Sequence, residues 1–294
     1  MIVITAPTGN IGRQVVSALL DKGVPLRLVV RDPAKLDRAW LDRAEIVKGS
    51  HADGHVLDKA LDGATRIFWL VPSDVTAPNA EAAYVDFSRP FGQRLAGSAV
   101  THVVSVSALG RGWNTDAGHA SASIRMDDML AASGVNYVSL AAVSLMSNIA
   151  RQTDLIRAQG VFYYPAPGNL KLRHVAPQDV STIAIRKLLS PDWSGFDEIP
   201  MVGPRDLTYQ EIAAIMTDVL GRKITFHEMS MADMGNMMKG NGASEGMARA
   251  MVDMLSAKNE GLDHVVERSP ADIVNSPTTF RQWCEGVLKP ALMG

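Results

Sequence analysis

Two glycines near the start of the chain have the spacing of a loop that binds phosphate groups. Gly9 and Gly12 lie in the segment APTGNIG, residues 6–12. Because a glycine has no side chain, backbone N–H groups can approach a pyrophosphate closely at these positions. A helix that begins nearby directs the partial positive charge of its first turn to the same place. We therefore expect a dinucleotide to contact Thr8, Gly9, Asn10, Ile11 and Gly12.

The segments that flank this loop are those that a dinucleotide site requires. Residues 2–5, IVIT, have the β-branched composition of a buried strand, and apolar residues then recur at helical spacing from Ile11 to Leu20. Gly23 is a typical helix end, and residues 24–30 are again typical of a strand. Strand, glycine turn, helix and strand form one βαβ unit. This context favours dinucleotide binding over a tight turn without a ligand.

The residues after the second strand indicate which dinucleotide binds. An acidic side chain there bonds the ribose 2′-hydroxyl of NAD, whereas an arginine accommodates the 2′-phosphate of NADP. Arg31 follows the strand directly and Lys35 adds a second positive charge, while Asp32 before a proline is typical of a turn. The pattern favours NADPH over NADH, with a solvated Arg31 as the alternative interpretation.

The first 35 residues resemble the NmrA-like branch of the atypical short-chain dehydrogenases/reductases. Members usually carry a GxxGxxG turn; here Ala6 stands at the first glycine, and Gly9 and Gly12 match the other two. The similarity continues more weakly in AEIVKGS, VTHVVSVSALG, MLAASGVNYVSL and LTYQEIAAIMTDVLGRKI. The resemblance implies a Rossmann sheet that binds NAD(P)H, with Arg31 at the place of the phosphate-binding arginine.

Up to residue 150, predicted strands and helices alternate in the pattern of a doubly wound parallel sheet. In the resembling family an aspartate after the third strand helps hold the adenine; this chain has Ser50 there, either an altered adenine contact or a loop residue. Ligands of such sheets bind beyond the carboxyl ends of the strands, which indicates Val71, Pro72, Ser73 and residues 105–109, with Ser105 as a cofactor contact. We expect residues 1–150 to form the dinucleotide-binding core. The predicted strands are 45–48, 66–71, 101–106 and 135–140, and the helices are 56–61, 79–97 and 122–133.

Residues 151–294 are expected to form a smaller α/β lobe that closes over the cofactor, with part of the chain returning to the main sheet. Strands are predicted at 199–202 and 224–227, and a helix at 208–220 begins with the capping box of Thr208 and Glu211. Eight of the 15 methionines lie in residues 229–254. Their helical spacing favours core packing, whereas interspersed glycines favour a partly mobile loop and a lid that lines a substrate pocket.

No pair of residues matches the acid–base machinery that is common in short-chain dehydrogenases. None of the five tyrosines is followed, four residues later, by the lysine that would lower its pKa. The catalytic residue is therefore unknown, and Ser107 and His119 are weak candidates beside structural or surface roles. Hydride transfer to an electrophile needs no protein acid, because the cofactor carries the chemistry.

Two functions fit these features. The first is an NADPH-dependent reductase that transfers hydride to a small electrophilic or aromatic substrate, such as a quinone or an imine, in an apolar pocket. The second is a non-catalytic NADP(H)-binding redox sensor that acts through a protein partner, as the resemblance to a regulator in the same family implies. The methionine-rich segment favours the reductase and the missing acid–base pair favours the sensor. We prefer the reductase.

The composition excludes several other classes. Lys and Arg number 29 against 31 Asp and Glu, so no basic excess exists for nucleic acid. A single cysteine, Cys284, rules out an intrachain disulfide and a thiolate metal cluster, and no metal site is predicted. Without a signal-peptide pattern or a long apolar stretch, we expect no membrane association and a cytoplasmic location. The expected partner is a small-molecule substrate, and a homodimer is left open.

Overall fold

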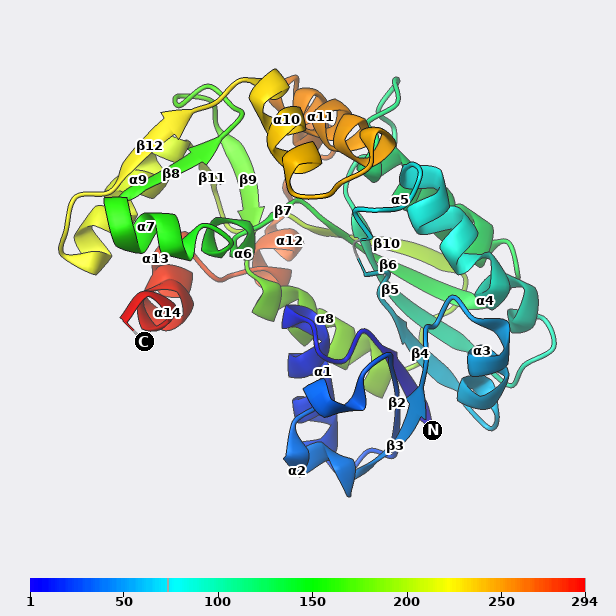
Figure 1. Cartoon of the computed structure of the whole chain (residues 1–294). Coiled ribbons are helices and arrows are strands. Elements are labelled where there is room, and N and C mark those ends of the chain that lie inside the picture. Colours follow the sequence, from blue (N-terminus) through cyan, green and yellow to red (C-terminus); the bar gives the residue numbers. More distant parts are fainter. Residues whose placement is uncertain (73, 294) are drawn as a thin grey trace.

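A seven-stranded parallel sheet forms the centre of the computed structural model, which describes residues 1–72 and 74–293 (Figure 1). The strand order is β10-β6-β5-β4-β1-β2-β3, and every neighbouring pair is parallel. From β1 the chain adds β2 and then β3 on one side of β1, and β4 then pairs with the opposite side of β1. This reversal is the switch point at which such sheets bind ligands. The strands are β1 (Ile2–Thr5), β2 (Leu26–Val30), β3 (Ala44–Lys48), β4 (Arg66–Trp69), β5 (His102–Ala108), β6 (Asn136–Ala142) and β10 (Phe196–Met201).

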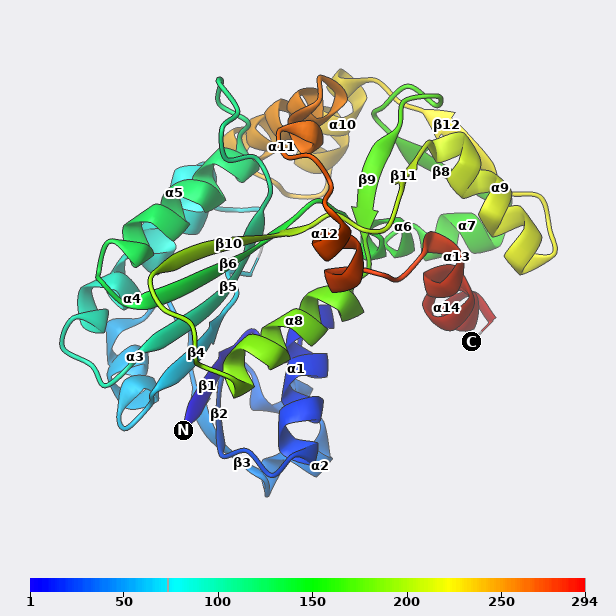
Figure 2. The ribbon, with the colours of Figure 1, turned by 180° about the vertical axis from the view of Figure 1, so that it is seen from behind.

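Helices cover both faces of this sheet, as the doubly wound prediction requires (Figure 2). One face carries α1 (Asn10–Asp21), α2 (Arg38–Leu41) and α8 (Pro177–Leu189), and α1 and α8 pack against each other. The other face carries α3 (Gly54–Leu61), α4 (Phe87–Leu95) and α5 (His119–Ala131). The prediction of a parallel α/β sheet is confirmed.

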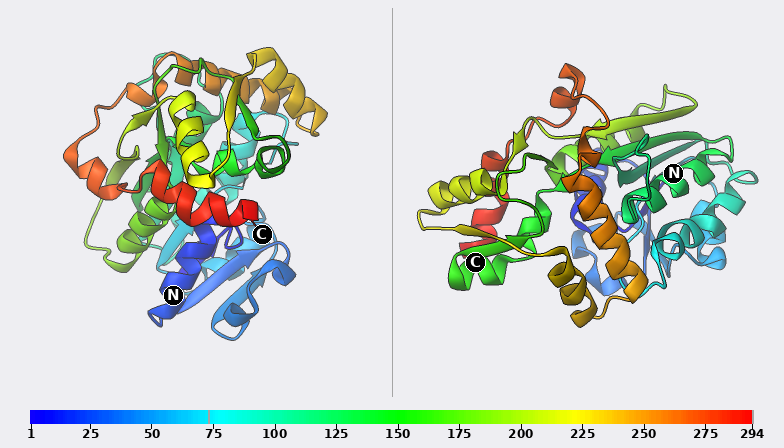
Figure 3. Two further views of the ribbon diagram at one scale, coloured as in Figure 1. Left: turned by 90° about the vertical axis from the view of Figure 1, so that its left-hand side faces the viewer. Right: turned by 90° about the horizontal axis from the view of Figure 1, so that it is seen from above.

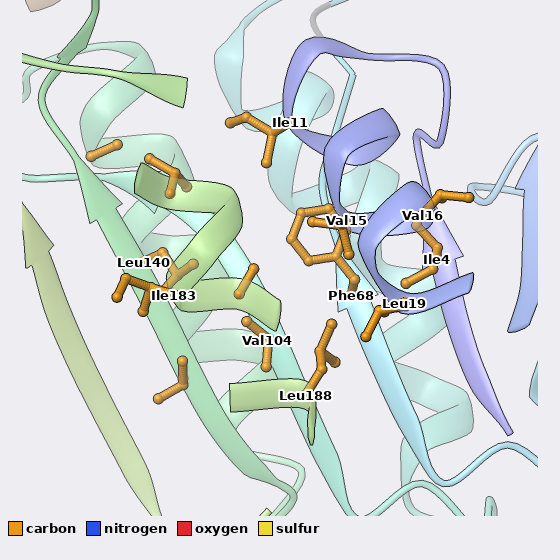
Figure 4. Close-up of a cluster of buried hydrophobic side chains, with 14 of the residues drawn as sticks. Ile4, Ile11, Val15, Val16, Leu19, Phe68, Val104, Leu140, Ile183 and Leu188 are labelled. Atoms are coloured by element: carbon orange, nitrogen blue, oxygen red, sulfur yellow. The ribbon is translucent and has the colours of Figure 1, made fainter. Parts of the chain in front are cut away.

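A buried apolar cluster holds α1 and α8 against the sheet (Figure 4). Burying each aliphatic side chain of this size contributes about 1.5–3 kcal/mol. The cluster joins residues far apart in sequence, so α8 belongs to the core although it follows residue 150. Its labelled members are Ile4, Ile11, Val15, Val16, Leu19, Phe68, Val104, Leu140, Ile183 and Leu188.

Some predicted strand ends lie elsewhere. β4 ends at Trp69 rather than residue 71, because the N–H of Leu70 donates to the Thr5 hydroxyl and not to a backbone carbonyl of the neighbouring strand. β5 continues to Ala108, two residues past the predicted end, because β6 continues beside it to Ala142. The helix predicted at 79–97 is divided: a π-helical turn, Ala82–Asp86, precedes α4, which contains Pro90.

A second hydrophobic core organises the lobe beyond the sheet. Its strands form two small sheets, in the orders β11-β9-β7 and β12-β8. Thr208 and Glu211 form the predicted capping box at the start of α9. The strands are β7 (Ser144–Leu145), β8 (Val161–Tyr164), β9 (Leu172–Val175), β11 (Asp206–Leu207) and β12 (Thr225–Glu228), and the helices are α6 (Ser147–Ala150), α7 (Thr153–Gln159), α9 (Tyr209–Leu220), α12 (Pro270–Asn275), α13 (Phe280–Trp283) and α14 (Lys289–Met293).

The methionine-rich segment is a pair of helices rather than a partly mobile loop. The helices α10 (Met231–Gly240) and α11 (Glu245–Asn259) pack against each other, and α11 packs against α5 (Figure 3). Ser230 and Ser244 are the N-caps of these two helices. The glycines of the segment had favoured a loop and gave no sign of these caps. Met247 is buried, whereas α10 buries none of its residues. The core-packing interpretation therefore holds for part of α11 only.

Candidate functional site

The turn between β1 and α1 presents an uncapped helix N-terminus at the switch point. The backbone N–H of Gly9 donates to the carbonyl of Ala6 at 3.1 Å, and Ala6 adopts a left-handed conformation with φ 48°. Gly9 is the N-cap of α1, and no side chain bonds the first N–H groups of this helix. These groups remain available to a phosphate, and the contact of a cofactor with Thr8 to Gly12 stays a prediction.

The two glycines of the turn have different steric surroundings. A Cβ atom at Gly12 would overlap the carbonyl oxygen of Ala6, so only glycine lets α1 pack this closely on the turn. A Cβ atom at Gly9 would meet that oxygen at 3.4 Å, an ordinary contact, and nothing else within 4 Å. Open space above Gly9 therefore fits a ligand. The side chain of Ile11 is buried in the core, so only its backbone can face a cofactor.

Positive side chains follow β2 at the same edge of the sheet. Arg31 is exposed and directly follows Val30, and Lys35 is exposed on the next turn. Asp32 caps that turn by accepting from the N–H of Ala34, as its turn interpretation predicted. Arg13 was missed by the sequence reasoning; its guanidinium donates to the carbonyl of Thr8 and adds charge beside the turn. Its signal was an arginine directly after the second glycine.

Ser50 and His51 follow β3, next to β2 at this edge. The Ser50 hydroxyl accepts a hydrogen bond from the N–H of Ala52 within a local turn, and Ser50 is half-buried. His51 is buried between Trp69 and Phe87, and its Nε2 lies 3.1 Å from the carbonyl oxygen of Leu70. Burial lowers the pKa of His51 to about 4; the bond to Leu70 opposes this shift. His51 thus fixes the loop that carries Ser50 to the end of β4.

The end of β4 is braced at the switch point by Thr5. The N–H of Leu70 donates to the Thr5 hydroxyl at 2.8 Å, and that hydroxyl donates to the carbonyl of Phe68. Val71 and Pro72 come next and are half-buried, at the edge where a ligand was predicted. Ser73 lies outside the described residues. Hydrogen bonds from Thr76 lower the pKa of Asp74, and the charge of Arg31 adds to this effect, so Arg31 faces the loop after β4.

Ser105 lies inside the sheet rather than at its edge. Because β5 continues to Ala108, Ser105 is three residues from the strand end and fully buried beside Trp69 and Ser139. This burial contradicts its predicted contact with a cofactor outside the edge. Ser107 is also buried, and its catalytic role stays a prediction.

His119 is buried at the start of α5, in contrast to its possible surface role. Neither ring nitrogen has a hydrogen-bond partner among the described residues, and the ring meets Tyr84 edge-on at 5.9 Å. Burial lowers the pKa of His119 below its usual value. Met247 of α11 packs against the Tyr84 side of this pair. Ser107 and His119 are not hydrogen-bonded to each other.

The helix α11 docks on the loop that follows β4. The N–H of Ser244 donates to the carbonyl of Val75, and its hydroxyl donates to the carbonyl of Ala77. At Gly246, a Cβ atom would overlap the carbonyl oxygen of Pro78. The methionine-rich helices are therefore attached to a loop that begins at the predicted cofactor edge.

A hollow lies on the lobe side of the same edge. It is small, with room for about one water molecule, and its wall combines aromatic rings with polar groups. The residues that bear on its chemistry are Ser144, Asn148, Phe162, Tyr164, His174 and Tyr209. Asn148 lies in α6. The others come from β7, β8, β9 and α9, which no local motif connects.

The switch-point turn, the uncapped helix and the positive edge together define a dinucleotide-binding protein of the Rossmann type. The chain belongs to the NAD(P)H-binding family, whose model matches residues 7–187. The resemblance to NmrA-like reductases is thereby confirmed, as is the binding of a nicotinamide dinucleotide.

Several proteins that are similar over nearly the whole chain are named as reductases or oxidoreductases. The chain is 23% identical to an NAD(P)H azoreductase of Xenophilus azovorans, over 97% of both chains. It is 26% identical to quinone oxidoreductase 2 of Escherichia coli, over 95% of both. The solved NADPH complex of the E. coli NADPH-dependent quinone oxidoreductase has the same fold, with a TM-score of 0.80, 23% identity and coverage of 98% of this chain and 100% of that one. The family is thus one of NAD(P)H-binding reductases.

Within the described residues, no helix has both the length and the apolar character needed to cross a bilayer. Residues 1–72 and 74–293 also bring together no group of three or more His, Cys, Asp or Glu side chains that could hold a metal ion.

Proposed function

We propose that this protein is an NADPH-dependent reductase of a small electrophilic or aromatic substrate, such as a quinone or an imine. The observation that carries the proposal is the turn after β1, where no side chain caps the N-terminus of α1 and its N–H groups are free for a phosphate. Aromatic and polar side chains of the lobe lie just beyond β6. The names of the relatives, an azoreductase and a quinone oxidoreductase, support the reaction class.

The turn before α1 leaves backbone N–H groups without side-chain partners. Thr8, Gly9 and Asn10 would offer backbone groups to the pyrophosphate, and Arg31, with Lys35 nearby, would bind the 2′-phosphate that distinguishes NADPH from NADH. The bound cofactor supplies a hydride, and the protein supplies orientation and a pocket. We assign the cofactor to residues 1–150, together with the α8 and β10 segments of the same sheet, and the choice of substrate to the lobe formed by the remainder of residues 151–294.

The test has two stages. NADPH and NADH are titrated into the pure protein while nicotinamide fluorescence is followed; we expect tighter binding of NADPH, and no binding of either would refute the proposal. Oxidation of NADPH is then followed at its absorbance band with quinones, imines and azo dyes. Consumption that depends on one of these substrates supports a reductase. Tight NADPH binding without turnover of any of them would favour the redox sensor instead.

A further inference from the structure

A buried histidine lies where the adenosine half of the cofactor is expected. His51 belongs to the loop after β3, and its ring contacts the carbonyl oxygen of Leu70, the first residue after β4. The charge of Arg31 acts on His51 and on Asp74, so Arg31 lies close to both loops. In NADPH one ribose carries both the 2′-phosphate and the adenine. If Arg31 binds that phosphate, the base therefore lies beside His51.

The position of the proton on the His51 ring is fixed by its surroundings. Nε2 lies 3.1 Å from the Leu70 carbonyl oxygen, and a carbonyl oxygen only accepts hydrogen bonds, so Nε2 carries a proton. Burial lowers the pKa of His51 to about 4, so the ring is neutral near pH 7 and has no second proton. Nδ1 is therefore an acceptor and not a donor.

This acceptor is held in place but is not closed off. The ring lies edge-on between Trp69 and Phe87, with centroid distances of 5.0 and 4.9 Å, which limits its rotation. Among the described residues Nδ1 has no hydrogen-bond partner, and it is not one of the unpaired polar atoms that the fold shields from solvent. Nδ1 therefore remains available to a donor that approaches from the cofactor edge.

Ser50 offers a second group beside this histidine, with a different property. Its hydroxyl oxygen accepts from the N–H of Ala52, which leaves the hydroxyl proton free to donate. Because a hydroxyl group rotates and has a second lone pair, it can also accept from a ligand. Ser50 can therefore bond a donor or an acceptor, whereas His51 with its fixed tautomer can bond only a donor.

We infer that His51 selects the base of the cofactor, by accepting a hydrogen bond at Nδ1 from the 6-amino group of adenine. This inference rests on the proposed NADPH-dependent function. Adenine presents that amino donor next to the acceptor N1, to which the Ser50 hydroxyl donates. A 6-oxo purine such as hypoxanthine presents an acceptor at position 6 and a donor at N1. Ser50 adapts to this reversal and His51 does not, so the site favours a 6-amino purine.

The test compares NADPH with its 6-oxo analogue, in which hypoxanthine replaces adenine and the reduced nicotinamide is unchanged. Both are titrated into the full wild-type chain, and nicotinamide fluorescence gives the two dissociation constants without turnover. We expect the analogue to bind about tenfold more weakly, because its oxygen faces the lone pair of Nδ1. In His51→Phe, which keeps a ring between Trp69 and Phe87, the two affinities should differ by less than about twofold.

The matched controls are Asp74→Ala and Ser50→Ala. Asp74 is another acceptor on which the charge of Arg31 acts, and its removal should keep the tenfold ratio of about ten between the two affinities. Ser50→Ala should weaken the binding of both nucleotides and also keep this ratio, because the hydroxyl adapts to either base. Loss of the ratio in Asp74→Ala, or its persistence in His51→Phe, would overturn the inference.

The wild type provides a measurement that needs no variant to fold. Nitrogen NMR of the imidazole should show Nδ1 of His51 without a proton, and NADPH should shift this resonance far more than the 6-oxo analogue does. A protonated Nδ1 would contradict the inference. If the wild type binds both nucleotides equally well, the inference is wrong and the NADPH-dependent function stands. If it binds neither nucleotide, the proposed function fails as well.

Discussion

The cofactor side and the substrate side of the site present different kinds of group to a ligand. On the cofactor side the candidate groups are backbone N–H groups of the four-residue turn 6–9 and of the first turn of α1, with Gly9 and Gly12 within one βαβ unit. On the substrate side the candidate groups are side chains, among them His174 and Tyr209, from strands and helices that are far apart in sequence. A backbone site depends on local conformation, whereas a side-chain site depends on how distant elements pack.

The difference has consequences for what each side tolerates. At Gly12, an added methyl group would overlap fixed backbone atoms. Around the hollow, a removed hydroxyl would leave the packing intact. We therefore expect steric changes to be most harmful on the cofactor side and chemical changes to be most informative on the substrate side.

The largest effect is expected for Gly12→Ala. Its Cβ would overlap the carbonyl oxygen of Ala6, and backbone atoms cannot move aside as a flexible side chain can. We expect a loss of about 1–3 kcal/mol in the free energy of unfolding and at least tenfold weaker NADPH binding. Urea unfolding and fluorescence titration measure the two. Gly97→Ala is the control, because a Cβ there meets nothing within 4 Å; similar losses in both variants would contradict this account.

Two of the three buried histidines, one on each side, allow a direct comparison of the two sides at low pH. His51 on the cofactor side and His174 on the substrate side both have pKa values lowered by burial to about 4 from 6.5. Between these values the unfolded chain binds more protons, so their contribution to stability is complete above pH 6.5 and is lost as the pH falls through 4. At pH 5 each should have lost about 2 kcal/mol.

This loss is measured from urea midpoints at pH 7 and pH 5. The decrease in the free energy of unfolding from pH 7 to pH 5 should be about 2 kcal/mol smaller in His51→Gln and in His174→Gln than in the wild type. It should be unchanged in His55→Gln, where the side chain is exposed. Burial raises the pKa of Asp127 to about 6, which has the opposite sign and stabilises the fold as the pH falls through that value. The differences between variants, rather than the total drop, are therefore decisive. A histidine variant that keeps the full drop would show that its ring is not held neutral.

The same contrast explains how far the sequence could predict this molecule. The βαβ unit, the sheet class and the capping box of Thr208 and Glu211 are encoded in short stretches, and the structure has them where they were predicted. Ser105 was misplaced because the length of β5 is set by its pairing with β6, which is not a local property. The hollow was not predicted at all, since the partners of His174 are brought to it by three separate elements.

Loss of an exposed charge on the cofactor side should weaken NADPH binding less than a change in the shape of the turn. Arg31→Ala is expected to weaken NADPH binding about tenfold and to leave NADH binding nearly unchanged, because only NADPH has a 2′-phosphate for this guanidinium. Fluorescence titration of both cofactors measures the ratio. Arg38→Ala on α2 removes an equal exposed charge as a control. Equal weakening of NADPH and NADH in Arg31→Ala would show that Arg31 is not the phosphate-binding residue.

The smallest effect is expected at Ala6, where the turn departs from the GxxGxxG pattern. A left-handed conformation costs an L-residue about 1–2 kcal/mol, and Ala6 with φ 48° bears that strain. Glycine removes the strain but loses more chain entropy on folding, so Ala6→Gly should stabilise the protein by about 0.5–1 kcal/mol. The opposite change, Gly23→Ala, places a methyl group at φ 68° in open space and should destabilise it by about 1 kcal/mol. Because neither change alters the course of the backbone, both should leave NADPH affinity unaltered. A large gain in affinity for Ala6→Gly would instead mean that the turn rearranges on binding, and that the cofactor side is less rigid than its backbone contacts imply.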